Sequence, residues 1–329
     1  MAQIQVESLR KTFKISKRQS GLKNATKAFF KREYEEVVAL SDVSFSINNG
    51  EIVGYIGPNG AGKSTTIKIL CGILVQDSGK CTVNGRIPWK DRKEHVKRIG
   101  VVFGQRSQLW WDVPSEDSFQ LLKDIYDIDD KVFKRNKDTL IELLKLHEIV
   151  KIPVRNLSLG QRMQCEIVAS LLHDPEILFL DEPTIGLDAI SKLSIRNFIK
   201  GVNREKSMTV ILTTHDMSDI EALSNRIMLI GKGTLLYDGD LNSIKQKYIT
   251  IKNVEIKYSS ERKNKLPILN DVDILGESDG SILIKINTNK ISLSSVLAAF
   301  SNSLTIDDVV VSVVDLDDIM VRLYKDLKL

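Results

Sequence analysis

Short continuous runs of apolar residues recur along the chain, and segments with helical periodicity separate them. The runs are Ile52–Ile56, Ile99–Phe103, Ile177–Leu180, Val210–Thr213 and Ile227–Ile230. A strand that is buried on both faces of a parallel sheet has this pattern, and its alternation with helices is typical of α/β proteins. The pattern therefore predicts an α/β fold with a largely parallel sheet.

Two further segments, Ile4–Glu7 and Val43–Ile47, alternate apolar and polar residues as half-buried strands do. The turn signal Asn48–Gly50 follows the second of them and predicts a hairpin into the apolar run at Ile52–Ile56. Residues 80–87 predict another short strand and turn. From about Ser115 to Lys151, and again over Gln161–Leu172, apolar residues recur at helical spacing, which predicts helices.

The pattern changes after about Asp240, where a polar link precedes shorter elements. Strands or helices are expected at Val254–Tyr258, Val272–Leu275, Ile282–Ile286, Leu293–Phe300, Val309–Val314 and Leu316–Leu327, with a hairpin turn at Asp279-Gly280. We therefore expect one large domain over residues 1–244 and a small α+β domain over residues 245–329.

The composition fits this two-domain organisation. The chain has 329 residues, of which 42% are hydrophobic and 27% charged, as in an ordinary globular protein. It contains no apolar run of the roughly 18–20 residues needed to cross a bilayer, and no segment that resembles a signal peptide. The three cysteines, Cys71, Cys81 and Cys165, lack metal-ligand spacing and predict reduced, buried thiols in a cytoplasmic protein.

Basic residues concentrate in one segment. The net charge of +4 is too small to predict nucleic-acid binding, but residues 14–32 hold a run of Lys and Arg without an acid, together with Phe29 and Phe30. Two interpretations stay open. The segment is either a solvated part of the surface or a basic amphipathic piece that rests near anionic lipid headgroups.

The loop Gly57–Ser64 fits the phosphate-binding pattern G-x-x-x-x-G-K-[ST] and lies between an expected strand and an expected helix. In that context the glycines let backbone N–H groups approach a phosphate, Lys63 can reach the β- and γ-phosphates, and the Ser64 hydroxyl can ligate Mg²⁺. An ordinary glycine turn is the alternative interpretation, which the strand–loop–helix context disfavours. The loop predicts a site for a nucleoside triphosphate.

Polar residues that follow other buried strands extend this site. Asp181 and Glu182 follow the run Ile177–Leu180, where one carboxylate can hold Mg²⁺ and the next can activate a water molecule. His215 ends another strand, in a position to contact the γ-phosphate, and Gln105 can contact Mg²⁺ and water. Alternatively, Asp181 and Glu182 only cap a helix, and His215 has a purely structural role.

A second helix start can also bind an anion. Ser158 is a natural N-cap for the helix expected at Gln161–Leu172, and Gly160 allows close approach of a ligand. The chain thus has two helix N-termini that can bind a phosphate but only one phosphate loop. This suggests that the second helix N-terminus binds the nucleotide of another subunit.

Taken in order, these segments resemble the motif set of the ATP-binding subunits of ABC transporters, over residues 1 to about 240. The set comprises Gly57–Ser64 (Walker A), Gln105 (Q-loop), Leu157–Gln161 (signature), Ile177–Glu182 (Walker B), Gly186–Asp188 (D-loop) and His215 (H-loop). The resemblance implies a P-loop ABC ATPase domain. Such a domain has a mostly parallel sheet, an antiparallel β subdomain and a helical subdomain, here at about residues 106–172.

The resemblance also implies roles for individual residues. ATP would contact Phe13, Gly57, Pro58, Asn59, Gly60, Ala61, Gly62, Lys63, Ser64 and Thr65, and Mg²⁺ would contact Ser64, Gln105 and Asp181. The catalytic residues would be Glu182, His215 and Gln105. The residues that act across a head-to-tail dimer of two copies would be Ser158, Leu159, Gly160, Gln161 and Asp188. Leu159 stands where the family most often has glycine, and Phe13 stands where it usually has tyrosine.

Residues 104–112 resemble a stretch in ATPases of ABC-2 type exporters, near the daunorubicin-resistance and viologen-exporter groups. Within this stretch, Trp110 and Trp111 are either core residues or a docking point for a membrane partner. The resemblance implies separate permease subunits and a place on the cytoplasmic face of the membrane. A regulatory or immunity ATPase without a transport partner is the alternative, and the transported substrate is not predicted.

Overall fold

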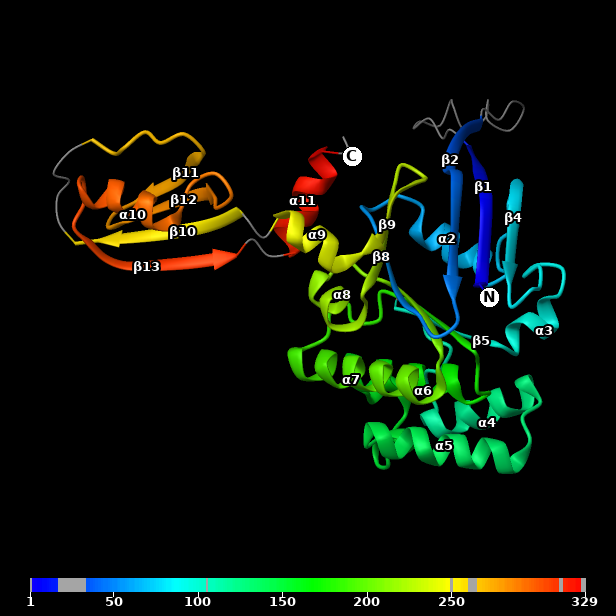
Figure 1. Cartoon of the computed structure of the whole chain (residues 1–329). Helices are drawn as coiled ribbons and strands as arrows, with labels where there is room; N and C mark the ends of the chain where they lie inside the picture. Colours follow the sequence, from blue (N-terminus) through cyan, green and yellow to red (C-terminus); the bar gives the residue numbers. More distant parts are fainter. Residues whose placement is uncertain are drawn as a thin grey trace, which may run out of the picture. The chain divides into compact units, whose positions relative to one another are not determined.

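The computed structural model describes residues 2–16, 34–104, 106–248, 251–259, 265–313 and 316–326. The chain divides into two compact units, Met1–Gly239 and Asp240–Leu329 (Figure 1). Gln105 and most of the basic segment, residues 17–32, lie outside the described residues.

The first unit is built on a nine-stranded sheet with the order β4-β1-β2-β9-β8-β3-β7-β6-β5. The strands are β1 (Ala2–Ser16), β2 (Tyr34–Asn48), β3 (Ile52–Ile56), β4 (Ser78–Val83), β5 (Ile99–Phe103), β6 (Ile177–Asp181), β7 (Thr209–Thr213), β8 (Arg226–Gly231) and β9 (Thr234–Asp240).

The centre of this sheet is parallel, as the apolar runs predict. β3 pairs in parallel with β7 and β8, and β6 pairs in parallel with β5 and β7. β7 lies between β3 and β6 and is buried along its whole length. All five predicted runs are strands, and the carboxyl ends of β3, β6 and β7 meet at one edge of the sheet, where parallel sheets bind ligands.

The other end of the sheet is antiparallel and larger than the sequence suggested. β1 pairs with β2 and with β4 in antiparallel register, and β1 and β2 each continue for 15 residues. The hairpin predicted at Asn48–Gly50 is wrong. The turn is present, but β3 leaves it to pair with β7 and β8, so that β9 and β8 lie between β2 and β3 in the sheet.

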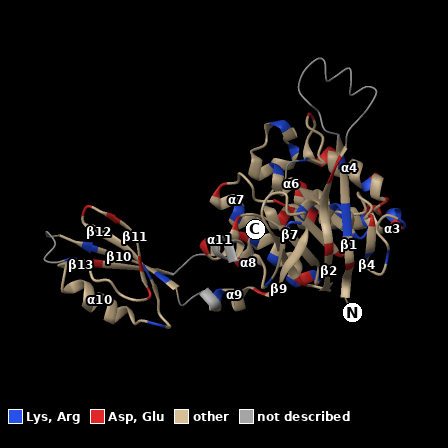
Figure 2. Ribbon diagram, turned by 90° about the horizontal axis from the view of Figure 1, so that it is seen from above, with Lys and Arg blue, Asp and Glu red and all other residues tan. Residues whose placement is uncertain are grey.

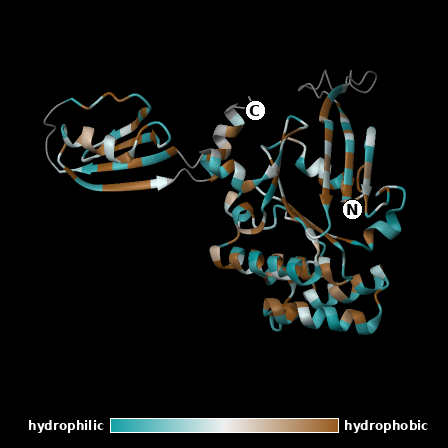
Figure 3. Ribbon diagram, viewed as in Figure 1, coloured by the Kyte–Doolittle hydropathy of each residue, from teal (hydrophilic) through white to brown (hydrophobic). Residues whose placement is uncertain are grey.

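Some helices of the first unit pack on this sheet, and others pack mainly on one another. They are α2 (Lys63–Leu70), α3 (Arg92–Val96), α4 (Ser115–Tyr126), α5 (Asp130–Leu144), α6 (Leu159–Leu171), α7 (Ala189–Lys206) and α8 (Met217–Leu223), with short turns η1 (Ile149–Lys151) and η2 (Val154–Asn156). Buried residues of α2 share one hydrophobic core with strands of both the antiparallel and the parallel part. The predicted helical region corresponds to α4, α5 and α6. Both α4 and α5 pack on α6, and the three helices carry alternating hydrophilic and hydrophobic bands (Figure 3).

The second unit contains a four-stranded antiparallel sheet with the order β11-β12-β10-β13. Its elements are α9 (Leu241–Tyr248), β10 (Ile251–Tyr258), β11 (Val272–Ser278), β12 (Ser281–Asn287), α10 (Leu293–Ser301), β13 (Ile306–Val313) and α11 (Leu316–Asp326). The predicted hairpin at Asp279-Gly280 joins β11 to β12. Val296 and Phe300 of α10 pack on the sheet in a separate hydrophobic core.

Charged residues of both signs are interspersed along the ribbons of the chain (Figure 2). Cys71, Cys81 and Cys165, all within the described residues, are buried free thiols as predicted. In the part of the chain that the structure describes, no helix combines the length and the apolar character needed to cross a membrane.

Candidate nucleotide-binding site

The loop between β3 and α2 has the geometry of a phosphate cradle. Gly62 adopts a left-handed φ of 112° directly before α2, a conformation that side chains rarely tolerate. A Cβ atom at Gly57 would lie 2.2 Å from the carbonyl oxygen of Ile230 in β8. The glycines therefore let the loop pass close to the sheet and wrap the N-terminus of α2, where backbone N–H groups favour an anion.

Lys63 places a positive charge inside this loop. Its side chain is only 8% exposed, and Nζ donates to the carbonyl oxygens of Gly57 at 2.6 Å and Pro58 at 3.2 Å. Burial lowers the pKa of Lys63, while the charges of Glu182 and Asp181 act in the opposite direction. An ammonium group held within the loop is a suitable partner for phosphate oxygens.

Oxygen ligands suited to Mg²⁺ converge beside the loop. Ser64 Oγ lies 3.3 Å from Asp181 Oδ2, and Thr213 Oγ1 donates to Asp181 Oδ1 at 2.5 Å. Hydroxyl and carboxylate oxygens are the ligands that Mg²⁺ prefers, so Ser64 and Asp181 fit this ion. Thr213 was not among the predicted site residues, although a hydroxyl residue at the end of the buried strand β7 was an available signal.

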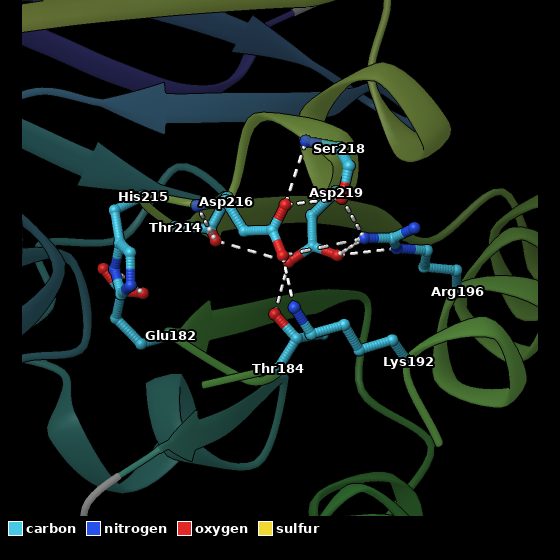
Figure 4. A network of polar contacts seen from close by, with 9 residues as sticks. All are labelled: Glu182, Thr184, Lys192, Arg196, Thr214, His215, Asp216, Ser218 and Asp219. Carbon is cyan, nitrogen blue, oxygen red and sulfur yellow. Dashed lines mark hydrogen bonds and ion pairs between the residues drawn. The ribbon is translucent and has the colours of Figure 1, made fainter. Parts of the chain in front are cut away.

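Glu182 and His215 form a pair at the ends of β6 and β7 (Figure 4). His215 Nδ1 lies 2.8 Å from Glu182 Oε2. The Glu182 backbone has a φ of 58°, which costs a non-glycine residue energy, and its N–H donates to Thr213 O at 3.0 Å. A Cβ atom at Gly104 would lie 2.4 Å from Glu182 O, so glycine is required there for β5 to approach.

The residues predicted as the signature form a second cluster at the start of α6. Ser158 caps the helix by accepting from Gln161 N at 3.2 Å, and Gln161 Oε1 accepts from Ser158 N at 3.0 Å. A Cβ atom at Gly160 would lie 2.3 Å from Ser191 Oγ, and this hydroxyl donates to Asp188 at 2.7 Å. Hydrogen bonds from Ser191 lower the pKa of Asp188. The residues predicted as the signature and as the D-loop thus lie close to each other in the structure.

The other predicted residues have different surroundings. Phe13 is half-buried on β1 opposite Val37 of β2, with the Lys11 ammonium 5.7 Å from its ring centre. Its contact with adenine stays a prediction. Gln105 lies outside the described residues, so its predicted roles are not located.

The tryptophan pair is exposed. Trp110 is 60% and Trp111 is 51% exposed, so the interpretation as core residues is wrong. Trp110 N donates to Ser118 Oγ at 3.0 Å, and the Arg162 guanidinium lies 5.6 Å from the Trp111 ring centre. The pair is thus an apolar surface held by α4 and α6.

The arrangement brings a phosphate-binding loop, a buried cation, metal-binding oxygens and a carboxylate–imidazole pair to one edge of a parallel sheet. A general base beside bound phosphate can activate water for phosphoryl transfer. The fold and the site define the chain as a P-loop nucleoside triphosphatase.

Comparisons with known proteins place it within that class. The sequence model of the ABC transporter family matches residues 40–185. The chain is 31% identical to the uncharacterized ABC transporter ATP-binding protein YhcH of Bacillus subtilis (strain 168), over 79% of this chain and 81% of that protein. It is 34% identical to the linearmycin resistance ATP-binding protein LnrL of the same organism, over 64% of this chain and 67% of that protein.

Solved structures share the fold. The ATP-binding cassette MJ0796, solved as a dimer in a post-hydrolysis state with ADP and Pi, aligns with a TM-score of 0.59 at 24% identity, over 72% of this chain and 98% of that one. The chain belongs to the ABC transporter ATP-binding proteins. The resemblance found in the sequence is confirmed, and the protein is an ABC ATPase that uses ATP with Mg²⁺.

Proposed function

We propose that this protein powers an ABC-2 type exporter through separate permease subunits. The observation that supports sharing of the nucleotide between two copies is the division of the site into two clusters within one chain. Lys63, Asp181, Glu182 and His215 meet at the end of the sheet, whereas the signature makes its own contacts with the D-loop. A resistance protein such as LnrL among the relatives supports the exporter assignment.

Each predicted residue has a role in this proposal. The residues of the loop, Gly57–Thr65, hold the phosphates, and Ser64 with Asp181 holds Mg²⁺, which when bound neutralises the charge on the phosphates. Glu182 accepts the proton of the attacking water, and His215 orients the carboxylate of Glu182 and contacts the γ-phosphate. Gln105 assists at the metal, and Phe13 stacks on adenine.

Two copies complete each other in the proposed head-to-tail dimer. Ser158, Leu159, Gly160 and Gln161 of one copy face the γ-phosphate bound to the loop of the other, with Asp188 between them. The Ser158 hydroxyl and the start of α6 favour an anion, which supports this arrangement. ATP closes the dimer, and hydrolysis opens it.

The proposed location is the cytoplasmic face of the membrane, on the permease. Trp110 and Trp111 supply an exposed aromatic surface for this contact. The basic segment, residues 14–32, would add attraction to anionic headgroups.

Coupling to a permease gives a direct test. Co-reconstitution in lipid vesicles with its proposed permease subunits is expected to stimulate ATP hydrolysis several-fold. Trp110→Ser with Trp111→Ser should remove most of the stimulation, because the contact loses its aromatic surface. Ile268→Ser, at a fully exposed residue of the second unit, is the matched control.

The regulatory alternative predicts a different result. A purified protein that hydrolyses ATP at the same rate with and without any such membrane protein, and that does not co-purify with it, would contradict coupling to transport.

A further inference from the structure

A fully buried carboxylate lies beside the Glu182–His215 pair without belonging to it (Figure 4). Asp219, in α8, is 0% exposed. It accepts hydrogen bonds from Thr184 Oγ1, from Thr214 Oγ1 at 3.3 Å and from Arg196 Nε at 2.6 Å. Thr184 lies two residues after Glu182, and Thr214 directly precedes His215. One side chain therefore joins the segments that carry both members of the pair.

The position of Asp219 is energetically demanding. A buried carboxylate is costly unless it is paired and its oxygens accept hydrogen bonds. Arg196 of α7 supplies the pairing charge, and the two threonine hydroxyls supply further donors. Because Thr184 and Thr214 are themselves almost fully buried, loss of the carboxylate would leave their hydroxyls without this acceptor.

A second ion pair holds the same loop. Asp216, directly after His215, pairs with Lys192 of α7 and accepts from Ser218 N at 3.0 Å. Burial alone would raise the pKa of Asp216, but the hydrogen bonds from Lys192 and Ser218 outweigh it and lower the pKa to about 2. The carboxylate is therefore charged at neutral pH, and both sides of His215 are fixed to α7 and α8.

Glu182 needs such support. Its left-handed backbone conformation persists only where neighbouring contacts hold it, and Thr184 is the nearby anchor on its C-terminal side. We propose that Asp219 is a positioning residue for hydrolysis: with Arg196 it holds Thr184 and Thr214 so that Glu182 and His215 face each other. This inference rests on the proposed roles of Glu182 and His215.

The test is Asp219→Asn, with kcat, KM for ATP and the thermal midpoint measured together. We expect kcat to fall roughly 10- to 100-fold, since small displacements of catalytic groups have effects of that size. KM should change less than about twofold, because the hydrogen bonds and the ion pair of the Asp219 carboxylate in the described residues involve Thr184, Thr214 and Arg196 and not the loop around Lys63. The matched control is Asp174→Asn. It removes an exposed carboxylate that pairs with Lys206 of α7, the helix that also carries Arg196.

A second variant serves if Asp219→Asn does not fold. Thr184→Val removes one donor and keeps the shape of the side chain, and we expect a several-fold loss of kcat with KM unchanged. Parent kcat in a folded Thr184→Val or Asp219→Asn variant, with only the thermal midpoint lowered, would overturn the inference. Glu182→Gln, measured in parallel, distinguishes failure of the positioning role of Asp219 from failure of the proposed function. If Glu182→Gln also retains parent activity, the proposed function has failed, not only the positioning role.

Discussion

Glu182→Gln is expected to abolish steady-state ATP hydrolysis while leaving ATP bound between two copies of the chain. Glutamine keeps the size of the side chain and can still meet His215, but it cannot accept the proton of the attacking water. Loss of a general base lowers rates by roughly 10²–10⁴-fold. Because hydrolysis is proposed to open the dimer, the variant should accumulate as a closed, ATP-loaded dimer that size-exclusion chromatography with light scattering detects.

A matched substitution controls for nonspecific damage. Glu176→Gln changes the same residue type just before β6, where Glu176 forms an exposed pair with Arg98, and should hydrolyse ATP at the parent rate. If Glu182→Gln also turns over ATP at the parent rate, another residue is the base, and the pairing with His215 has no role in proton transfer.

Lys63→Ala is expected to have the second large effect, on nucleotide binding. Lys63 is the buried cation of the phosphate loop, and each hydrogen bond to a charged group contributes about 1.5–3 kcal/mol. Loss of its contacts to the phosphates should therefore weaken ATP binding by roughly 100-fold, since about 1.4 kcal/mol corresponds to a factor of ten. Calorimetry or fluorescent ATP displacement measures this change directly.

Lys68→Ala, on the same helix α2, removes an ammonium that is not part of the loop and should bind ATP like the parent. An unchanged affinity of Lys63→Ala, with a parent-like thermal midpoint, would mean that the phosphates bind elsewhere.

The sequence predicted the parallel core and the main clusters of the site for simple physical reasons. A strand buried on both faces must be apolar throughout, so runs such as Ile177–Leu180 stand out. Parallel strands end at a common edge, and hence the polar residues that follow them, among them Asp181 and His215, come together. The glycine loop is visible because only glycine permits its backbone.

Other features depend on partners distant in the sequence. The turn at Asn48–Gly50 looks like that of a hairpin, yet the pairing of β3 is decided by β7 and β8. β1 and β2 extend beyond their alternating segments because they pair with each other. Asp219 looks like any acid on a short helix, and its burial against Arg196 becomes visible only when α7 packs on α8.

The central claim is that each nucleotide is held by the loop of one copy and the signature of the other. Ser158→Asp tests it well, because aspartate still caps α6 while its charge repels phosphate. Neither Ser158→Asp nor Lys63→Ala should hydrolyse ATP alone. Mixed, they form dimers in which the loop of the Ser158→Asp chain faces the intact signature of the Lys63→Ala chain, so we predict that activity returns. A mixture as inactive as its components would show that each chain uses its own signature, and would contradict the account.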